Sequence, residues 1–423
     1  MKYAEMNENQ LSQEISKLRA EYDEFKSMNL KLNMARGKPG QEQLALSLPM
    51  LDVLNSKSDF KAENGIDCRN YGELTGIVDA KKMFSEYMGV NDNEIIVVGS
   101  SSLTFMYDSM ARAMLKGVLG SEKPWCKYDK VKFICPVPGY DRHFTICEFL
   151  DIEMIPVPLN EDGPDMDIIE ELIKDESVKG MWCVPKYSNP LGSVFSEKAV
   201  KRLANMKPAA KDFRIFWDNA YAVHYVYKDV PVCNILEECK KAGNPNMCYM
   251  FGSTSKITFP GAGVAFFAAS EENIKFVEKQ LSAQSISWDK MNMLRHVRFF
   301  KNADGIREHM RKHAEILRPR FDSVINALKN NLAPMGIGSY VEPDGGYFVT
   351  YMAPKGCAKR IVELCKEAGV TLTGAGATHP YKNDPDDSYI RIAPSFPSIE
   401  ELDKAMEIFC VCAKIAYAEK LSK

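Results

Sequence analysis

The sequence predicts an α/β fold, in which helices wrap a mostly parallel sheet and a smaller α+β domain lies beside it. Short apolar stretches alternate with amphipathic helical stretches up to about residue 270. Several of these stretches are apolar throughout, as expected for strands that are covered on both faces. Beyond residue 270 the pattern changes to a long helical region followed by two separated strands. Strand–helix alternation favours a parallel sheet, and the change of pattern indicates a second domain.

The chain is expected to begin with an amphipathic helix, because apolar residues recur there at spacings of three and four. They are Leu11, Ile15, Leu18, Tyr22 and Phe25. Seven strands are then expected, with helical segments such as 196–206 between many of them. The strands are EIIVVG (94–99), KVKFIC (130–135), IEMIPV (152–157), GMWCV (180–184), FRIFWD (213–218), MCYMFG (247–252) and VAFFAA (264–269).

The last third of the chain is expected to contain more helix than strand. A helical region near 288–330 precedes GYFVTY (346–351), a helix near 356–368 and SYIRIA (388–393). Ser398 and Glu401 form the S-x-x-E pattern of a capping box, which predicts a final helix. We therefore expect a large domain over 60–290 and a small domain built from both chain ends, 1–59 and 291–423.

Composition narrows the classes of function. The 423 residues include 54 basic and 57 acidic side chains, a net charge of −3, so nucleic acid is not an expected partner. No apolar run reaches the roughly 18 residues of a spanning helix, and the first residues do not resemble a secretory signal, so no membrane partner is expected. The twelve cysteines are scattered without a C-x-x-C pair. This favours reduced thiols in a cytoplasmic protein and no metal site.

Common nucleotide and hydrolase motifs are absent from the sequence. There is no G-x-G-x-x-G, no G-x-x-x-x-G-K-[ST] and no G-x-S-x-G. Dinucleotide oxidoreductases, P-loop NTPases and α/β-hydrolases therefore have no support from motifs.

Three strand ends carry chemical groups instead. The first leads into Ser100-Ser101-Ser102 at a helix start, where free backbone N–H groups and hydroxyls suit a phosphate. Another ends in Asp218, and a third leads into Ser253-Thr254-Ser255-Lys256. Each feature alone is common. Together they supply what pyridoxal phosphate needs: an anion site, an acid for the ring nitrogen and an amine for the aldehyde.

Motifs spread over nearly the whole chain carry a resemblance to a known family. They are Gly37-Lys38-Pro39, Asn70-Tyr71-Gly72, Pro136-Val137-Pro138-Gly139-Tyr140, Ser188-Asn189-Pro190-Leu191-Gly192, Asp218-Asn219-Ala220-Tyr221, Ser253-Thr254-Ser255-Lys256 and Ile390-Arg391-Ile392. With these residues the chain resembles the fold type I, class I/II aminotransferases, most closely an aspartate-aminotransferase-like subgroup.

The resemblance implies roles around the cofactor. Lys256 would form the Schiff base, Asp218 would pair with the pyridine nitrogen, and Tyr140 would stack on the ring. Asn189 and Tyr221 would bind its 3-oxygen. The phosphate would be bound by hydroxyl groups and by a tyrosine of the neighbouring subunit: Ser100, Ser101, Ser102, Ser253, Ser255 and Tyr71. Lys256, Asp218 and Tyr221 would be catalytic.

The resemblance also implies a substrate site and a homodimer. Arg391 would bind the substrate's α-carboxylate, with Gly37 and Asn189 beside it. A planar guanidinium suits this better than an ammonium. Because Tyr71 would reach the neighbouring subunit's phosphate, the active unit would be a homodimer.

Two positions depart from the family's pattern. The family carries an arginine as phosphate ligand eight residues after the lysine, where this chain has Val264. Leu191 stands where threonine is commoner. Without that arginine, the phosphate would be bound by the serines, by Tyr71 or by an unidentified cation.

The expected function is transfer of an amino group from aspartate, or a similar dicarboxylic L-amino acid, to a 2-oxo acid such as 2-oxoglutarate. A second cation would then bind the distal carboxylate, and Arg36, Lys38, Arg142 and Arg295 are candidates. Two alternatives stay open. One is a β-lyase or decarboxylase reaction on the same cofactor. The other is a non-catalytic ligand-sensing domain, which would follow a helix-turn-helix module.

Overall fold

A computed structural model describes residues 2–423 and shows the expected α/β class. Its centre is an eight-stranded sheet, with the order β2-β9-β8-β7-β6-β3-β4-β5. The strands are β2 (Ile95–Val98), β3 (Lys132–Val137), β4 (Glu153–Asn160), β5 (Gly163–Pro164), β6 (Val178–Cys183), β7 (Arg214–Asp218), β8 (Cys248–Ser253) and β9 (Ala265–Ala268). All seven strands expected from the sequence of this region are present, and β5 is an additional short one.

The sheet is parallel from β4 through β8 and antiparallel at its margins. Strands β4, β3, β6, β7 and β8 pair in parallel, whereas β9 runs antiparallel to both β8 and β2. The connection between β8 and β9 spans only 254–264. Parallel neighbours need a crossover of a dozen or more residues, so this short connection reverses the chain direction.

Helices cover both faces of this sheet, as the continuously apolar strands predict. They are α3 (Val78–Met88), α4 (Ser102–Lys116), α5 (Asp141–Phe149), α6 (Met166–Leu172), α7 (Glu197–Asn205), α8 (Ile235–Lys241), α9 (Glu271–Leu281) and α10 (Lys290–Phe300). Successive residues of a strand pack into separate apolar cores on opposite faces of the sheet, so Ile215 and Trp217 lie on one face and Phe216 lies on the other. This is the two-residue period of a strand.

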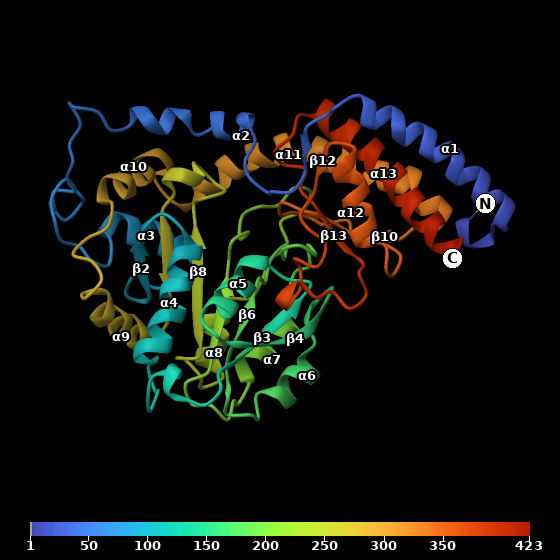
Figure 1. The fold of residues 1–423 in the computed structure, drawn as a ribbon. Helices are drawn as coiled ribbons and strands as arrows, with labels where there is room; N and C mark the ends of the chain where they lie inside the picture. Colours follow the sequence, from blue (N-terminus) through green and yellow to red (C-terminus); the bar gives the residue numbers. More distant parts are fainter. Residues whose placement is uncertain (1) are drawn as a thin grey trace.

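A second lobe contains both chain ends (Figure 1). It consists of α1 (Glu8–Ser27), α2 (Gln41–Ala45), α11 (Ala303–Asn331), α12 (Ala358–Glu367), α13 (Ile399–Leu421), the three-stranded sheet β10 (Ser339–Tyr340), β11 (Val349–Met352) and β13 (Tyr389–Ile392), and the parallel pair β1 (Leu32–Asn33) and β12 (Val370–Thr371). One apolar core includes residues of α1, α11, α12 and α13. The domain boundaries at 59/60 and 290/291 stay a prediction.

Helix boundaries follow local capping. The expected helical region 288–330 is two helices, because Lys301 has a positive φ of 69° and Asn302 caps α11 by accepting from the Gly305 N–H. The capping box before α13 forms as expected. Glu401 N donates to Ser398 Oγ at 3.2 Å, and Ser398 N donates to Glu401 Oε2 at 3.0 Å. Within residues 2–423, no helix combines the length and apolar character needed to cross a membrane.

Phe216 lies fully buried at the centre of an aromatic cluster on β7. Its ring centroid is 5.0 Å from that of Trp182 and 5.4 Å from that of Phe251. We expect Phe216→Ala to lower the free energy of unfolding by about 3–5 kcal/mol, because it removes apolar contacts and leaves a cavity. Denaturant and thermal unfolding measure this. Phe149→Ala, at a ring that is 70% exposed, is the matched control and should change stability little. Equal losses in both variants would contradict the expectation.

Candidate active site

A cavity of about 220 Å³ lies at the carboxyl ends of β6, β7 and β8. Open α/β sheets bind ligands at this edge, because their strand ends and the following loops converge there. Nine of the residues singled out from the sequence line this cavity. They are Ser101, Ser102, Tyr140, Asn189, Asp218, Tyr221, Ser253, Ser255 and Lys256.

Asp218, the last residue of β7, has one oxygen free to bind a ligand. Its side chain is 3% exposed, and His143 Nε2 lies 3.0 Å from its Oδ2. The other oxygen, Oδ1, has no hydrogen-bond partner among residues 2–423. His143 is held in turn by stacking on Trp182, with ring centroids 4.2 Å apart and planes inclined by 7°. A buried acceptor without a partner is costly, so a donor from a ligand would stabilise this carboxylate.

Lys256 follows β8 and directs its ammonium toward the aromatic wall of the cavity. Its Nζ lies 4.9 Å from the centre of the Tyr221 ring. Burial lowers the pKa of Lys256 below that of an ordinary lysine, the Asp218 carboxylate opposes this shift, and Arg391 adds to it. Burial also raises the pKa of Tyr221 well above that of a free phenol. Burial therefore makes loss of the Lys256 proton easier and keeps the Tyr221 hydroxyl protonated.

The backbone of Lys256 is held by side chains that come from other parts of the chain. Tyr347 Oη donates to its carbonyl oxygen at 3.3 Å, and His224 Nε2 lies 3.4 Å from the same oxygen. Since a carbonyl only accepts, His224 must carry its proton on Nε2. Gln43 on α2 donates to Tyr347 Oη at 3.0 Å. The second lobe thus contributes to the position of the lysine.

The serines meet where α4 begins. Ser253 Oγ donates to Ser255 Oγ at 3.1 Å, and Ser255 Oγ donates to the Ser100 carbonyl at 3.3 Å. Ser101 is the N-cap of α4, yet its hydroxyl caps no N–H group of the described chain. The first turn of α4 thus combines free N–H groups, hydroxyls and the positive end of a helix dipole, which together suit an anion.

Val264 contributes no charge to this anion site. Its side chain is 1% exposed within the apolar core, and its N–H donates to Thr254 Oγ1 at 2.9 Å. Ser100 itself does not line the cavity and contributes only through its carbonyl group. The serine hydroxyls and the first N–H groups of α4 at this end of the cavity are neutral, and Lys256 is the cation among the described lining residues.

Arg391, on β13, lies beside the cavity and is 8% exposed. Its Nη1 donates to Asn189 Oδ1 at 3.1 Å and to Asp141 Oδ1 at 3.3 Å, and its Nη2 donates to Thr373 Oγ1 at 3.1 Å. The guanidinium carbon lies 4.6 Å from the centre of the Phe348 ring. These contacts fix the plane of the guanidinium, as recognition of a carboxylate requires.

Gly37 approaches the same aromatic ring. A Cβ atom at Gly37 would lie 2.6 Å from Phe348 Cζ, so a larger residue would displace the ring on which Arg391 is stacked. Gly37 and Arg391 thus lie on one side of the site, next to the cavity.

Tyr71 is not brought to this cavity. Its side chain is 78% exposed, on the loop that follows Asn70. The four candidates for a second cation, Arg36, Lys38, Arg142 and Arg295, are also not among the described residues that line the cavity. Lys38 Nζ lies over the Phe396 ring at 3.7 Å, and Arg295 Nη2 donates to Asn292 Oδ1 at 2.8 Å.

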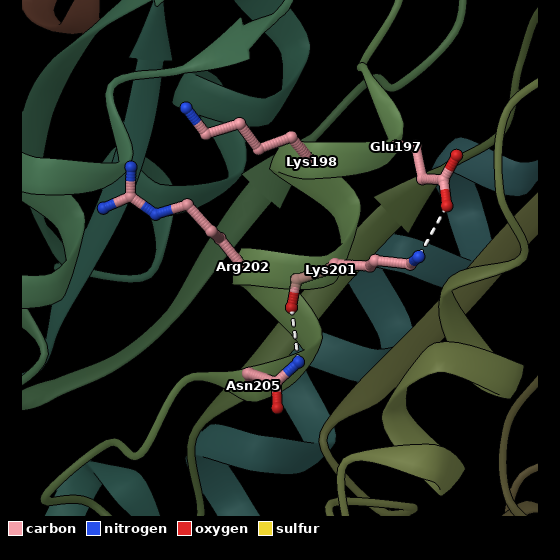
Figure 2. A pocket seen from close by; sticks show the side chains of 5 residues that line it. All are labelled: Glu197, Lys198, Lys201, Arg202 and Asn205. Atoms are coloured by element: carbon pink, nitrogen blue, oxygen red, sulfur yellow. Dashed lines mark hydrogen bonds and ion pairs between the residues drawn. The ribbon is translucent and has the colours of Figure 1, made fainter.

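A larger hollow of about 620 Å³ lies on the outer face of α7 and does not have the features of an active site (Figure 2). It is lined by Glu197, Lys198, Lys201, Arg202 and Asn205. Lys201 pairs with Glu197, and Arg202 pairs with Glu170 at 2.9 Å. Two of the three cations are thus paired on an exposed helix, and none of the residues singled out from the sequence lines this hollow.

The sequence analysis missed several residues with contacts at the site, among them Asp141, His143, Thr373, Tyr347 and His224. Asp141 and His143 follow Tyr140 within one helical turn, and this short spacing could have indicated that they lie near the site. Their partners Asp218 and Arg391 lie far along the chain, so the pairing itself has no local signal.

Comparisons with known proteins agree on one family. A family model described as aspartate amino-transferase matches residues 6–423. The chain is 47% identical to an aspartate aminotransferase of Corynebacterium glutamicum, over 95% of this chain and 93% of that protein.

Solved structures give the same result. An aspartate transaminase from C. glutamicum superposes with a TM-score of 0.97 at 45% identity, and the match covers 100% of this chain and 99% of the other. An α-aminoadipate aminotransferase of Thermus thermophilus, solved with N-(5'-phosphopyridoxyl)-L-leucine, has a TM-score of 0.75 at 21% identity, covering 92% and 93% of the two chains. That second likeness concerns the fold alone.

Proposed function

The chain belongs to the aspartate aminotransferase family and is an aminotransferase, and from this we propose that it moves the amino group of aspartate, or of a similar dicarboxylic L-amino acid, to a 2-oxo acid such as 2-oxoglutarate. The resemblance that the motifs predicted is confirmed at the level of the family. The observation that carries the proposal is that Lys256 and the unpartnered Asp218 Oδ1 lie at one cavity, and that Arg391 bonds Asn189 in the wall of this cavity.

The residues present fit pyridoxal phosphate as the cofactor. A cavity of about 150 Å³ holds a benzene ring, so the 220 Å³ found here has room for a substituted ring. The free Asp218 oxygen suits a protonated ring nitrogen, Tyr140 suits the ring face, and Asn189 and Tyr221 suit the 3-oxygen. The serines around the start of α4 suit the phosphate. When bound, pyridoxal phosphate supplies an aldehyde that takes up the amino group and a ring that withdraws electrons from the substrate's α-carbon.

The chain's own residues supply binding and proton transfer. Arg391 binds the α-carboxylate of the amino acid and of the 2-oxo acid, so one site serves both substrates. Lys256 Nζ moves the proton at the α-carbon, and burial, which lowers its pKa, makes its own proton easier to lose. Asp218, supported by His143, holds a proton on the ring nitrogen. Tyr221 donates its hydroxyl hydrogen to the ring oxygen, because its raised pKa keeps it protonated.

We also propose a homodimer. Tyr71 is exposed and lies outside the cavity of its own chain, as expected for a side chain that binds in a neighbouring subunit. Sedimentation of the active enzyme tests this. A fully active monomer would contradict both the dimer and the role of Tyr71.

The function is tested by mixing the purified protein with a panel of amino acids and following the visible absorbance of the cofactor. Aspartate and glutamate should bleach it and release the matching 2-oxo acid without ammonia or carbon dioxide. Release of ammonia or carbon dioxide instead would establish the lyase or decarboxylase alternative. Bleaching by other amino acids only would contradict the dicarboxylic substrate.

Arg391→Lys should raise the KM for the amino acid by about 10- to 100-fold. A lysine offers a point charge in place of the planar fork and loses one charge-assisted hydrogen bond to the carboxylate. Steady-state kinetics with aspartate measure this. The matched control is Arg320→Lys, at a buried arginine that pairs with Glu42 at 3.0 Å away from the cavity. An unchanged KM in the Arg391→Lys variant would contradict the assignment of Arg391 to the α-carboxylate of the substrate.

A further inference from the structure

The start of α10 holds the loop that carries Tyr71. Lys290, the first residue of α10, is 2% exposed. Its Nζ donates to the carbonyl oxygens of Asn70 and Gly72, at 2.9 Å in the case of Gly72. These two carbonyls flank Tyr71, whose side chain is 78% exposed. A buried ammonium thus fixes the backbone on both sides of an exposed tyrosine.

Burying the Lys290 ammonium costs free energy of folding, so its presence indicates a role in positioning the loop that it binds. Among residues 2–423, the partners of the Lys290 ammonium are carbonyl oxygens and not carboxylates, so carbonyl dipoles compensate its charge. Removing an ammonium from water carries a large penalty. A methionine of similar length would pack at this position without that penalty. Unlike a methionine, the ammonium holds the two backbone oxygens at a fixed separation.

The loop needs such support, because its backbone is unusual. Gly72 has φ +102° and Glu73 has φ +58°, the left-handed region that a residue with a side chain adopts at a cost. A second side chain from the same segment helps, since Trp288 Nε1 donates to the Leu74 carbonyl at 2.8 Å. Two side chains in the segment 288–290 therefore hold three alternate carbonyls of the loop, those of Asn70, Gly72 and Leu74.

The same segment contacts the phosphate end of its own subunit. The Trp288 ring lies 3.9 Å from where a Cβ at Gly99 would be, and Gly99 leads into the Ser100–Ser102 turn. Asn292 Nδ2 donates to the carbonyls of Ala262 and Gly263, each at 2.9 Å, on the loop before Val264. The start of α10 thus organises loops at the end of the site where the family's arginine is replaced.

We propose that Lys290 is a positioning residue for the cofactor phosphate of the partner subunit, acting through the backbone of Asn70 and Gly72 to present Tyr71. The inference rests on the proposed function, in which Tyr71 binds that phosphate. The loop, held rigid by Lys290, would help to bind the phosphate at a site where position 264 supplies no charged side chain.

Lys290→Met tests this, because it keeps the length and apolar stem of the side chain and removes the three donors. The dissociation constant of pyridoxal phosphate, measured by equilibrium dialysis, should rise about tenfold, the lower end of the loss found when a residue that orients a metal ligand is replaced. Hydrogen exchange of the holoenzyme should accelerate in the peptide that contains 70–74. Trp288→Phe, which removes the bond to Leu74 together with part of the ring that packs near Gly99, should show a smaller change in the same direction and can be measured if Lys290→Met does not fold.

A double-mutant cycle with Tyr71→Phe separates positioning from general destabilisation. If Lys290 acts through Tyr71, the double variant should bind the cofactor no more weakly than the weaker single variant. Additive losses, or an unchanged constant in Lys290→Met, would overturn the proposal. Lys179→Met, which removes another buried ammonium in an ion pair with Asp212, should leave the constant unchanged.

The cycle also distinguishes this inference from the proposed function. A Tyr71→Phe variant with normal cofactor affinity would overturn the role of Lys290 and leave the aminotransferase assignment intact, because that assignment depends on Lys256 and on the products released.

Discussion

Replacing Lys256 with alanine should lower kcat for transamination by about 10⁴-fold or more, because one side chain supplies both the attachment point and the general base. The buried amine has a lowered pKa, and it lies in the cavity wall beside Tyr221. Its carbonyl is held by Tyr347, so truncation at Cβ removes the amine and leaves the backbone in place. Stopped-flow measurement of each half-reaction should show the loss in the proton-transfer step.

The matched control is Lys186→Ala. Lys186 is 8% exposed and pairs with Asp229, and it does not line the cavity. This variant should keep kcat within a few fold. A direct check is borohydride reduction followed by peptide mapping, which should fix the cofactor to the peptide that contains position 256. A label on another lysine would contradict the assignment, and so would near-normal turnover of Lys256→Ala.

The strands of the large sheet could be predicted because their signal is local. Several strands of the parallel core, such as β8, are largely apolar runs that are buried on both faces, whereas β4 alternates between buried and exposed residues. The antiparallel direction of β9 had no signal in its own residues, because it follows from the length of the preceding connection. The two-residue strands β1, β5, β10 and β12 are too short for any period to appear.

The site could be predicted to the extent that its residues lie at strand ends. Asp218, Ser253 and Lys256 come together because the carboxyl ends of parallel strands share one edge of the sheet. Residues that orient them come from elsewhere in the sequence. His143 contacts Asp218 from α5, and Tyr347 contacts the Lys256 carbonyl from the second lobe. Such contacts depend on packing between distant segments, so the order of residues along the chain does not show them.

Asp218→Asn should lower kcat by about 10³-fold, the size expected when a fixed group that stabilises charge in the transition state is removed. Asparagine has nearly the same shape, and its amide oxygen accepts from His143 Nε2 as the carboxylate does. Burial and packing against Trp182 are therefore kept, and only the negative charge is lost. An amide cannot hold a proton on the ring nitrogen, so the ring withdraws electrons from the α-carbon less strongly.

The kinetic pattern distinguishes this effect from a structural one. Because Arg391 and the start of α4 are untouched, KM for aspartate should change far less than kcat, and the solvent-exposed Asp229→Asn variant should match wild type in both. The α-deuterium isotope effect on kcat should increase in Asp218→Asn, since removal of the α-proton becomes more rate-limiting. A variant whose kcat and isotope effect equal those of wild type would show that the free Oδ1 of Asp218 is not the group that holds the ring proton. The unpartnered oxygen would then have to be explained by ordered water.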